Sequence, residues 1–408
     1  MADEHFDIVV IGGGAAGFFA AIHASENGKR VLILEKTAKL LSKVKVSGGG
    51  RCNVTHNCFY ANKLIENYPR GGKSLRKPFE LFGAKDTQQW FNSRGVPLKT
   101  EADGRMFPQS NTSQTIIDCL LQEAQKNKVE IRLKHEVLAV EKQNERFNLR
   151  IKDRAFISCD KLIVSTGGAN KKAAYNWLSQ LGFKVEEPIP SLFTFNVPDS
   201  DLKDFKGLSV KQGSVQVPAT KWKQEGPILI THWGFSAPAV IKLSAWAAID
   251  FFKKNYQFPI LINWVGFDEE RVREELNNIK QQHRKKQIIN QALFDIPSRL
   301  WVKLCEKAGV DEKQRYLDLP KKSLNRLVEM LVRCPYQING KTTFKEEFVT
   351  CGGVSLTEVD LKSFQSKTIS GLYLAGEVLN VDGVTGGFNF QHAWTSGYLA
   401  GKHAGESV

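Results

Sequence analysis

The sequence predicts an α/β protein that is built around a Rossmann-type βαβ unit and interrupted by a long insertion. Residues 6–35 contain an apolar stretch, a glycine-rich turn, an alanine-rich stretch and a second apolar stretch, which is the order strand, turn, helix, strand. Further buried strands are predicted at residues 163–168 and 368–377, and the composition changes between residues 190 and 350. We therefore expect one nucleotide-binding domain made of two chain segments, with the insertion between them.

The composition is that of an ordinary globular protein. The chain has 408 residues, of which 42% are hydrophobic and 25% charged, which excludes disordered and fibrous classes and allows two or three domains. No apolar run reaches the roughly 18 residues that a membrane helix needs, so we expect no membrane association. The acidic residues 1–7 do not resemble a secretion signal. The seven scattered cysteines contain no Cys-x-x-Cys pair, so we expect a cytoplasmic protein without disulfides or a metal site.

The net charge of +14 indicates an anionic partner. Nucleic acid, an anionic surface, or an anionic cofactor and substrate would each fit this charge. Short basic runs include Lys171 with Lys172, and Arg284 with Lys285 and Lys286, which we interpret as solvated helix faces. Because the charge is diffuse, we expect a small-molecule substrate and consider a nucleic-acid partner unlikely.

The glycine-rich turn after the first strand is the strongest motif. Gly12 would permit the tight turn, Gly14 would let the backbone approach a pyrophosphate, and Gly17 would allow the helix to pack closely on the strand. The N–H groups at the start of this helix would hold the phosphates. Glu35 ends the second strand, 23 residues after Gly12, and can accept hydrogen bonds from the ribose hydroxyls of an adenosine. The unit predicts a dinucleotide but does not distinguish NAD from FAD.

The two later strands favour FAD. The segment 368–377 ends in Gly-Glu and resembles the second FAD fingerprint of the glutathione-reductase-like superfamily, in which the terminal acid faces the ribityl chain. The segment 163–168 ends in Thr-Gly-Gly and resembles the turn at which that superfamily's chain leaves the FAD domain. No second Gly-x-Gly-x-x-Gly unit lies between them, so a dedicated NAD(P)H domain is not predicted. NAD(P)H could bind transiently over the flavin, or the substrate could reduce the flavin and oxygen could reoxidise it.

A loop at residues 47–55, with the sequence Ser-Gly-Gly-Gly-Arg-Cys-Asn-Val-Thr, narrows the resemblance from the superfamily to one family. With four other blocks it is similar to the BaiN-like family of FAD-dependent oxidoreductases, which includes aminoacetone-oxidase-like members. The resemblance covers about residues 6–403, and it departs at Ala237, where the family pattern has Gly, and at Cys351, where a smaller residue is usual. The matching blocks lie at residues 12–36, 47–55, 231–239, 349–354 and 371–391.

This resemblance implies a glutathione-reductase-like Rossmann FAD domain with an inserted β-barrel-like unit and a small helical bundle. The alternating pattern at 209–217 supports the β unit, and apolar positions three or four residues apart support helices at 271–283, 297–308 and 322–334. The expected domain boundaries are 1–190 and 351–408 for the FAD-binding domain and 191–350 for the insert, with the β unit at about 191–265, the bundle at about 266–335 and a return strand to 350.

Noncovalent FAD is the expected cofactor, and its candidate residues come from several separate segments. The three glycines 48–50 would bring N–H groups close to the ligand, with Arg51 and Asn53 as side-chain donors. The N-terminus of the last helix would face the flavin N1 and C2 carbonyl, and the backbone of Val137 would contact adenine. The candidates are Gly12, Gly14, Ala15, Ala16, Gly17, Glu35, Lys36, Lys43, Gly48, Gly49, Gly50, Arg51, Cys52, Asn53, Val137, Thr166, Gly167, Gly168, Gly376, Glu377, Asp382, Gly386, Gly387, Phe388 and Asn389.

Few side chains are candidates for the chemistry itself. His232 is the candidate for proton transfer, because a histidine pKa can lie near neutrality and the residue belongs to a matching block; it could equally cap or pack beneath the following helix. Asn389 and Gln391 could act on substrate or flavin, or could cap a helix. Cys52 and Cys351 lack the Cys-x-x-x-x-Cys spacing of disulfide reductases, so we interpret them as packing residues.

The predicted function is that of an FAD-dependent oxidoreductase that acts on a small organic substrate, with NAD(P)H as a possible electron donor. Two alternatives remain open. The first is an FAD-containing RNA-modifying enzyme, which the positive charge would suit. The second is a flavin-binding protein with a structural or sensing role.

Overall fold

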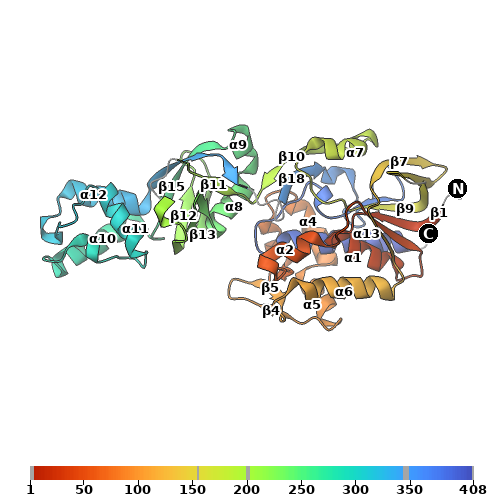
Figure 1. Cartoon of the computed structure of the whole chain (residues 1–408), viewed down its shortest axis with the longest axis horizontal. Helices are drawn as coiled ribbons and strands as arrows, with labels where there is room; N and C mark the ends of the chain where they lie inside the picture. The colour runs from red at the N-terminus through yellow and green to blue at the C-terminus, as the bar shows by residue number, and fades with distance from the viewer. Residues whose placement is uncertain (1–3, 154–155, 199–202, 343–348, 407–408) are drawn as a thin grey trace. The chain divides into compact units, whose positions relative to one another are not determined.

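The chain forms two compact units in the computed structural model, which describes residues 4–153, 156–198, 203–342 and 349–406 (Figure 1). The first unit comprises Met1–Ser191 and Phe344–Val408, and the second is Leu192–Thr343. Within the described ranges, no helix combines the length and the apolar character needed to cross a membrane.

A seven-stranded sheet forms the centre of the first unit. Four strands run parallel at one side of the sheet. The last of them, β9, pairs on its other edge with two different neighbours: its first half with an antiparallel strand and its second half with parallel β19. This arrangement confirms the predicted Rossmann-like α/β class. In spatial order the strands are β6 (Glu130–Leu133), β2 (Val31–Glu35), β1 (Glu4–Ile11), β9 (Ile157–Val164), β8 (Arg146–Ile151) and β7 (Val137–Gln143), with β19 (Leu372–Leu374) beside β9.

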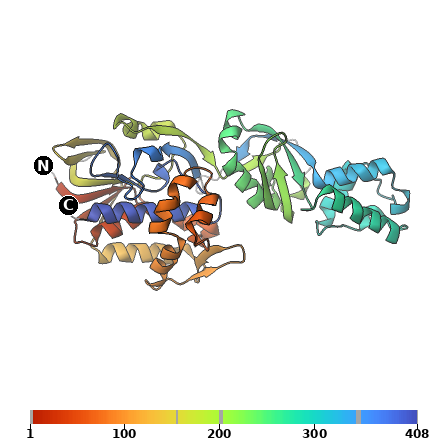
Figure 2. The ribbon, with the colours of Figure 1, turned by 180° about the vertical axis from the view of Figure 1, so that it is seen from behind.

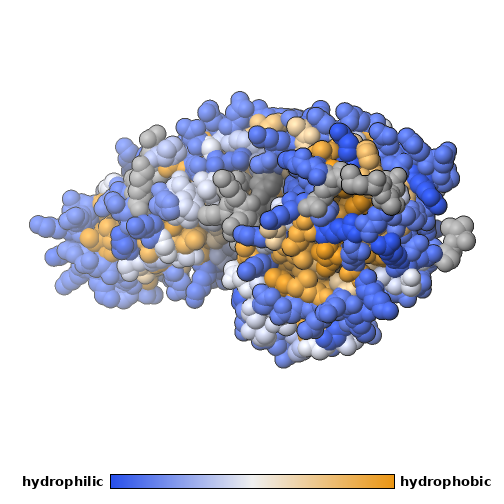
Figure 3. All heavy atoms as spheres, turned by 45° about the vertical axis from the view of Figure 1, so that its right-hand side comes forward, coloured by the Kyte–Doolittle hydropathy of each residue, from blue (hydrophilic) through white to orange (hydrophobic). Residues whose placement is uncertain are grey.

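Helices pack against this sheet, and two smaller strand groups complete the unit. The helices are α1 (Ala15–Ser25), α2 (Ser42–Gly50), α3 (Ala61–Leu64), α4 (Gly72–Leu81), α5 (Ala84–Asn92), α6 (Ser113–Lys126), α7 (Asn176–Gln180) and α13 (Phe388–Gly405). The strand groups are β3 (Thr55–His56), β5 (Arg105–Pro108) and β4 (Leu98–Thr100), and the antiparallel pair β10 (Val185–Ser191) and β18 (Val349–Val354). The surface that faces the viewer in Figure 3 is mostly hydrophilic, with an apolar area on this unit.

Helices α1 and α13 pack side by side at very short range, and Figure 2 shows α13 running across the first unit. A Cβ atom at Gly397 would lie 2.7 Å from the carbonyl oxygen of Ala16, and one at Gly405 would lie 2.6 Å from that of Ala24. Because the partners advance together along both chains, the helices are parallel and in register. At a rise of 1.5 Å per residue, Phe388, the first residue of α13, therefore lies about 12 Å along the helix axis before the level at which α1 begins. The N-termini of α1 and α13, which carry the positive ends of the helix dipoles, therefore point in the same direction but lie at different positions along it.

The second unit contains an antiparallel sheet and a helical bundle around one apolar core. The bundle helices α10, α11 and α12 lie within two residues of the expected ranges. In spatial order the strands are β16 (Cys334–Asn339), β15 (Gln257–Asn263), β12 (Ser209–Gln216), β13 (Lys223–Ile230), β14 (Gly234–Ser236), β11 (Thr194–Asn196) and β17 (Lys341–Thr342), and the helices are α8 (Pro238–Trp246), α9 (Ala248–Lys253), α10 (Glu269–Gln282), α11 (Ser298–Lys307) and α12 (Lys321–Val332).

Ala237, where the family pattern has Gly, precedes α8 with φ of +80° and ψ of 174°. This backbone region is strained for every residue except glycine. We expect Ala237→Gly to raise the free energy of unfolding of the second unit by about 1 kcal/mol, because the relieved strain exceeds the entropy that glycine adds to the unfolded chain. Urea unfolding followed by tryptophan fluorescence measures the change. The control Ala239→Gly, inside α8, should lower stability, and a loss of stability in Ala237→Gly would contradict the assigned strain.

Candidate functional site

The glycine-rich turn is fixed between three strands of the first unit. The N–H of Gly12 donates to the carbonyl oxygen of Leu34 at 2.8 Å, and the N–H of Gly13 donates to Oε2 of Glu35 at 2.9 Å. Gly12 has a φ of +113°, and a Cβ there would lie 2.4 Å from the carbonyl oxygen of Ser165, in the loop after β9. The turn therefore requires glycine at this position, and β1, β2 and β9 together hold it in place.

Gly14 and Gly17 serve different purposes in this turn. A Cβ at Gly17 would lie 2.0 Å from the carbonyl oxygen of Gly12, so this glycine is needed for the helix to lie against the strand. A Cβ at Gly14 would meet no atom within 4 Å. Helix α1 has no side-chain cap at its N-terminus, in front of which this open space lies. The space can receive a phosphate at a positive helix end.

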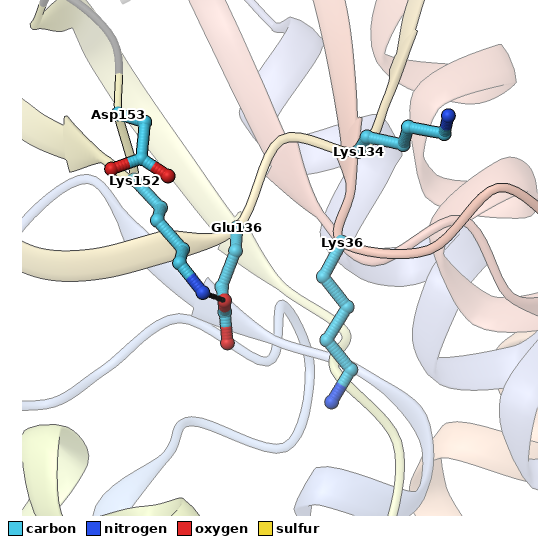
Figure 4. A pocket seen from close by; sticks show the side chains of 5 residues that line it. All are labelled: Lys36, Lys134, Glu136, Lys152 and Asp153. Atoms are coloured by element: carbon cyan, nitrogen blue, oxygen red, sulfur yellow. Dashed lines mark ion pairs between the residues drawn. The ribbon is translucent and has the colours of Figure 1, made fainter.

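Glu35 is held beside the turn, next to a polar cavity. Its Oε1 accepts a hydrogen bond from the N–H of Thr37 at 2.8 Å, in addition to the bond from Gly13. A cavity of about 310 Å³ opens nearby, and Figure 4 shows that Lys36 extends toward the same space as Glu136, which pairs with Lys152 at 3.6 Å. Val137 directly follows Glu136 in the chain. These positions fit an adenosine that lies over the carboxyl ends of β2 and β6. The lining residues are Lys36, Lys134, Glu136, Lys152 and Asp153.

The loop at residues 47–53 presents backbone N–H groups to an open side. Helix α2 loses its regular geometry at Ser47, and Gly48, Gly49 and Gly50 have φ of 58°, 68° and 83°. Cβ atoms at Gly49 and Gly50 would meet nothing within 4 Å, so a ligand can approach the backbone there. Arg51 is already engaged within the chain: its Nη1 lies 2.6 Å from Oε1 of Glu101. An anion at Arg51 would therefore compete with this carboxylate.

A second cluster forms where the two later segments meet. Oε2 of Glu377 lies 2.5 Å from Nζ of Lys43, and its Oε1 accepts the N–H of Thr350 at 2.8 Å. A Cβ at Gly168 would lie within 2.8 Å of the Glu377 carboxylate. The loop of Thr166, Gly167 and Gly168 thus lies directly against Glu377, and three other parts of the sequence converge on its carboxylate.

The N-terminus of α13 is the third part of the site. Gly386 and Gly387 have φ of 134° and 90°. Gly387 is the N-cap residue of α13 and supplies no side-chain hydrogen bond to the first turn of the helix. With its amide oriented so that Nδ2 donates to the carbonyl oxygen of Thr55, Asn53 accepts the N–H of Gly387 at 3.0 Å. The loop at residues 47–53 is therefore joined to the start of α13.

Two of the candidate side chains are occupied in holding this loop. Asn389 accepts the N–H of Gly383 at 2.8 Å and donates to its carbonyl oxygen at 3.0 Å. Its side chain therefore positions the loop, and its catalytic role stays a prediction. Asp382 is fully buried and pairs with Arg70, with 2.5 Å between Nε and Oδ1, while Ser191 donates to Oδ2 at 2.7 Å. Its carboxylate is therefore engaged within the chain, and the part of Asp382 in binding the cofactor stays a prediction.

Arg70 and His392 are site-supporting residues that the sequence did not reveal. Arg70 lies in a segment without a recognisable motif, so nothing in the sequence indicated that it pairs with Asp382, over 300 positions away. His392 lies on α13 with Nε2 at 3.3 Å from the carbonyl oxygen of Gly376, in the second fingerprint. Burial lowers the pKa of His392 to about 4, so its ring is neutral at physiological pH.

His232 lies in the second unit, between β13 and β14, whereas every predicted FAD-binding residue lies in the first. Its ring is exposed and meets the ring of Trp233 edge-on, with 4.1 Å between ring centroids. It does not cap α8, which begins after Ala237 without a side-chain cap. Its part in proton transfer stays a prediction.

The cysteines of the candidate site are buried thiols. Burial raises the pKa of both Cys52 and Cys351 to about 12, so they stay protonated at neutral pH. Cys58 alone among the seven is partly exposed. We expect a chromogenic aromatic disulfide to react rapidly with no more than one thiol of the native protein, and with all seven after unfolding. Cys58→Ser should abolish the rapid phase, and rapid labelling of Cys52 or Cys351, located by mass spectrometry, would contradict their packing role.

Comparison with known proteins identifies the family. The HI0933-like protein Rossmann domain matches residues 6–403. The chain belongs to this family. It is 29% identical to the ribosomal RNA dihydrouridine synthase of Escherichia coli (strain K12), over 98% of both chains, and 30% identical to the Haemophilus influenzae protein of the same name, over 97% of both. It is 26% identical to the 3-dehydro-bile acid delta(4,6)-reductase of Clostridium scindens, over 98% of this chain and 99% of the other.

Solved structures show the same fold at low sequence identity. The 3-ketosteroid-Δ4-(5α)-dehydrogenase from Rhodococcus jostii RHA1 aligns with a TM-score of 0.55 and 15% identity, over 100% of this chain and 98% of the other. A flavocytochrome c3 fumarate reductase aligns with a TM-score of 0.51 and 15% identity, over 98% and 78%. Membership of the HI0933-like family, together with the full-length relatives, makes this chain an FAD-dependent oxidoreductase. The predicted family, the predicted enzyme class and the FAD cofactor are confirmed. The ribosomal RNA relatives, however, do not support the expectation that nucleic acid is an unlikely partner.

Proposed function

We propose that this protein is an FAD-dependent reductase that saturates the C5=C6 bond of a uridine in ribosomal RNA. The observation that carries the proposal is the similarity, over nearly the whole chain, to two ribosomal RNA dihydrouridine synthases. The net charge of +14 suits a polyanionic substrate. The proposed bond is conjugated to a carbonyl group, so its reduction takes a hydride at one carbon and a proton at the other.

FAD, when bound, supplies the hydride chemistry, and the chain's own residues position it. The open space at Gly14 and the N-terminus of α1 would hold the pyrophosphate, and Glu35 would orient the adenosine ribose. The N-terminus of α13, about 12 Å further along the same direction, would stabilise negative charge at the far end of the dinucleotide. Lys43 and Glu377 would lie along the cofactor between these two helix ends.

A proton donor is needed as well, and we propose His232 for this role. Its exposed ring, without a hydrogen bond to the described residues, is free to exchange protons with solvent. We expect His232→Asn to lower kcat while leaving the FAD content unchanged. The matched variant His283→Asn, at the end of α10, should leave kcat unchanged.

A reductase of small conjugated ketones is the second candidate. The similarity to the bile acid reductase over 98% of this chain favours it, since that name also denotes reduction of C=C bonds. Both candidates need an electron donor, for which we propose NAD(P)H. Because the sequence contains no second Gly-x-Gly-x-x-Gly unit, we propose that NAD(P)H binds transiently and not in a dedicated domain.

The test supplies the FAD-loaded protein with NADH or NADPH and with unmodified transcripts of bacterial ribosomal RNA. The RNA is then digested to nucleosides, and dihydrouridine is measured by mass spectrometry. A parallel reaction contains a steroid enone in place of RNA. We expect dihydrouridine that depends on protein and reductant. Reduction of the steroid without dihydrouridine would favour the second candidate, and no reaction in either arm would contradict both.

A further inference from the structure

We infer that a basic surface on the helical bundle of the second unit binds the phosphate backbone of the RNA substrate; this rests on the proposed function and names its docking site. The surface comprises the loop after α10, the segment before α12 and the first turn of α12. We call it the bundle basic cluster. Its members are Arg284, Lys285, Lys286, Lys313, Arg315, Lys321 and Lys322.

Backbone pairing brings the two basic segments together. The N–H of Leu317 donates to the carbonyl oxygen of Arg284 at 2.9 Å, and the N–H of Tyr316 donates to that of Lys286 at 3.1 Å. Gln287 and Arg315 form an antiparallel bridge. The run 284–286 is therefore not a helix face, as its sequence had indicated, but one edge of a paired loop that ends where α12 begins.

The segments that carry the bundle basic cluster are anchored by buried residues and hydrogen bonds. Ile288 and Tyr316, which belong to the two paired segments, have no exposed surface, and Leu319 is 3% exposed. The indole N–H of Trp301, on α11, donates to the carbonyl oxygen of Ile288 at 2.9 Å, and Nζ of Lys280, on α10, donates to that of Leu319 at 2.9 Å. The charged groups are thus held on a fixed surface, which lowers the conformational entropy lost on binding a ligand.

The seven charges are exposed and are not neutralised within the described part of the chain. None of them has an ion-pair partner there, whereas other basic residues of the same bundle do: Arg333 pairs with Glu269 at 2.9 Å and Lys303 with Glu306 at 3.0 Å. The segments 284–286 and 313–322 contain seven Lys or Arg and a single acid, Asp318. Mutual repulsion among such charges favours binding of a polyanion.

The start of α12 adds a second feature that favours phosphate. Lys321 and Lys322 occupy the first turn of this 12-residue helix, where the helix dipole makes positive charge unfavourable. No side chain caps this turn. A phosphate bound here would receive both the free N–H groups and the lysine charges, which would turn an unfavourable arrangement into a favourable one.

The test compares two triple variants of equal charge change. The first is Arg284→Gln, Lys285→Gln and Lys286→Gln. The control is Lys85→Gln, Lys128→Gln and Lys253→Gln. These three lysines are also exposed and also lack ion-pair partners among the described residues. Binding of a fluorescent ribosomal RNA transcript to the FAD-loaded proteins is measured by anisotropy at several salt concentrations, with dihydrouridine formation assayed in parallel.

We expect the cluster variant to bind about tenfold more weakly near 0.15 M salt and to lose about 2 from the slope of log affinity against log salt, for three lost phosphate contacts. Its flavin content should be that of the wild type. If it binds like the control, the docking site is overturned while dihydrouridine formation by the wild type still supports the proposed function. If anionic vesicles compete with RNA only in the wild type, the cluster is a general anion surface and the RNA assignment is wrong. If the wild type makes no dihydrouridine, the proposed function itself fails.

Discussion

Gly14→Val is expected to weaken FAD binding at least about a hundredfold, or about 2.7 kcal/mol, without unfolding the protein. The reason is the open space in front of α1, where a Cβ at this position would meet no protein atom within 4 Å, so that a valine side chain would occupy the place of the pyrophosphate. Gly14 has φ of −94° and ψ of −172°, which valine adopts without strain. FAD affinity is measured by fluorescence titration of the apoprotein, and its stability by urea unfolding.

Gly17→Ala provides the contrast, because its Cβ would lie 2.0 Å from the carbonyl oxygen of Gly12. The Gly17→Ala apoprotein should be less stable than the wild type, and the variant should also bind FAD more weakly. A Gly14→Val protein that binds FAD like the wild type would show that the cofactor does not approach the backbone at this turn.

Arg70→Ala is expected to lower the free energy of unfolding of the first unit by about 3 to 5 kcal/mol, because it leaves the buried carboxylate of Asp382 without its partner. The lost ion pair joins the turn before α4 to the loop before α13, so FAD should also be held less tightly. Urea unfolding followed by flavin fluorescence measures both effects. The double variant Arg70→Met with Asp382→Leu removes both charges and should recover most of the stability. A single variant as stable as the wild type would contradict the buried pair.

The sequence predicted the parts of the fold that depend on local pattern. The strand, turn and helix at residues 6–25 follow from apolar periodicity and glycine spacing, and the bundle helices from apolar positions three or four residues apart. The matching blocks also indicated that the loop at residues 47–53 and the α13 N-terminus belong to one site, which the contact between Asn53 and Gly387 supports.

Long-range pairing of polar side chains could not be predicted in this way. Asp382 resembled a cofactor ligand because it stands beside a glycine-rich motif, but its partner Arg70 lies in a different block of sequence. Similarly, the run 284–286 indicated a helix face, because nothing in its sequence showed that residues 316 and 317 pair with it. Such contacts are set by tertiary packing, which a single sequence does not show.

The central claim is tested most directly by a single-turnover experiment without oxygen. The FAD-loaded protein is reduced with one equivalent of NADPH or NADH, or photochemically, and is then mixed with an unmodified ribosomal RNA transcript. We predict that the oxidised flavin absorption returns and that each flavin reoxidised yields one dihydrouridine in the RNA. A flavin that stays reduced in the presence of RNA, while a small conjugated ketone reoxidises it, would contradict the account.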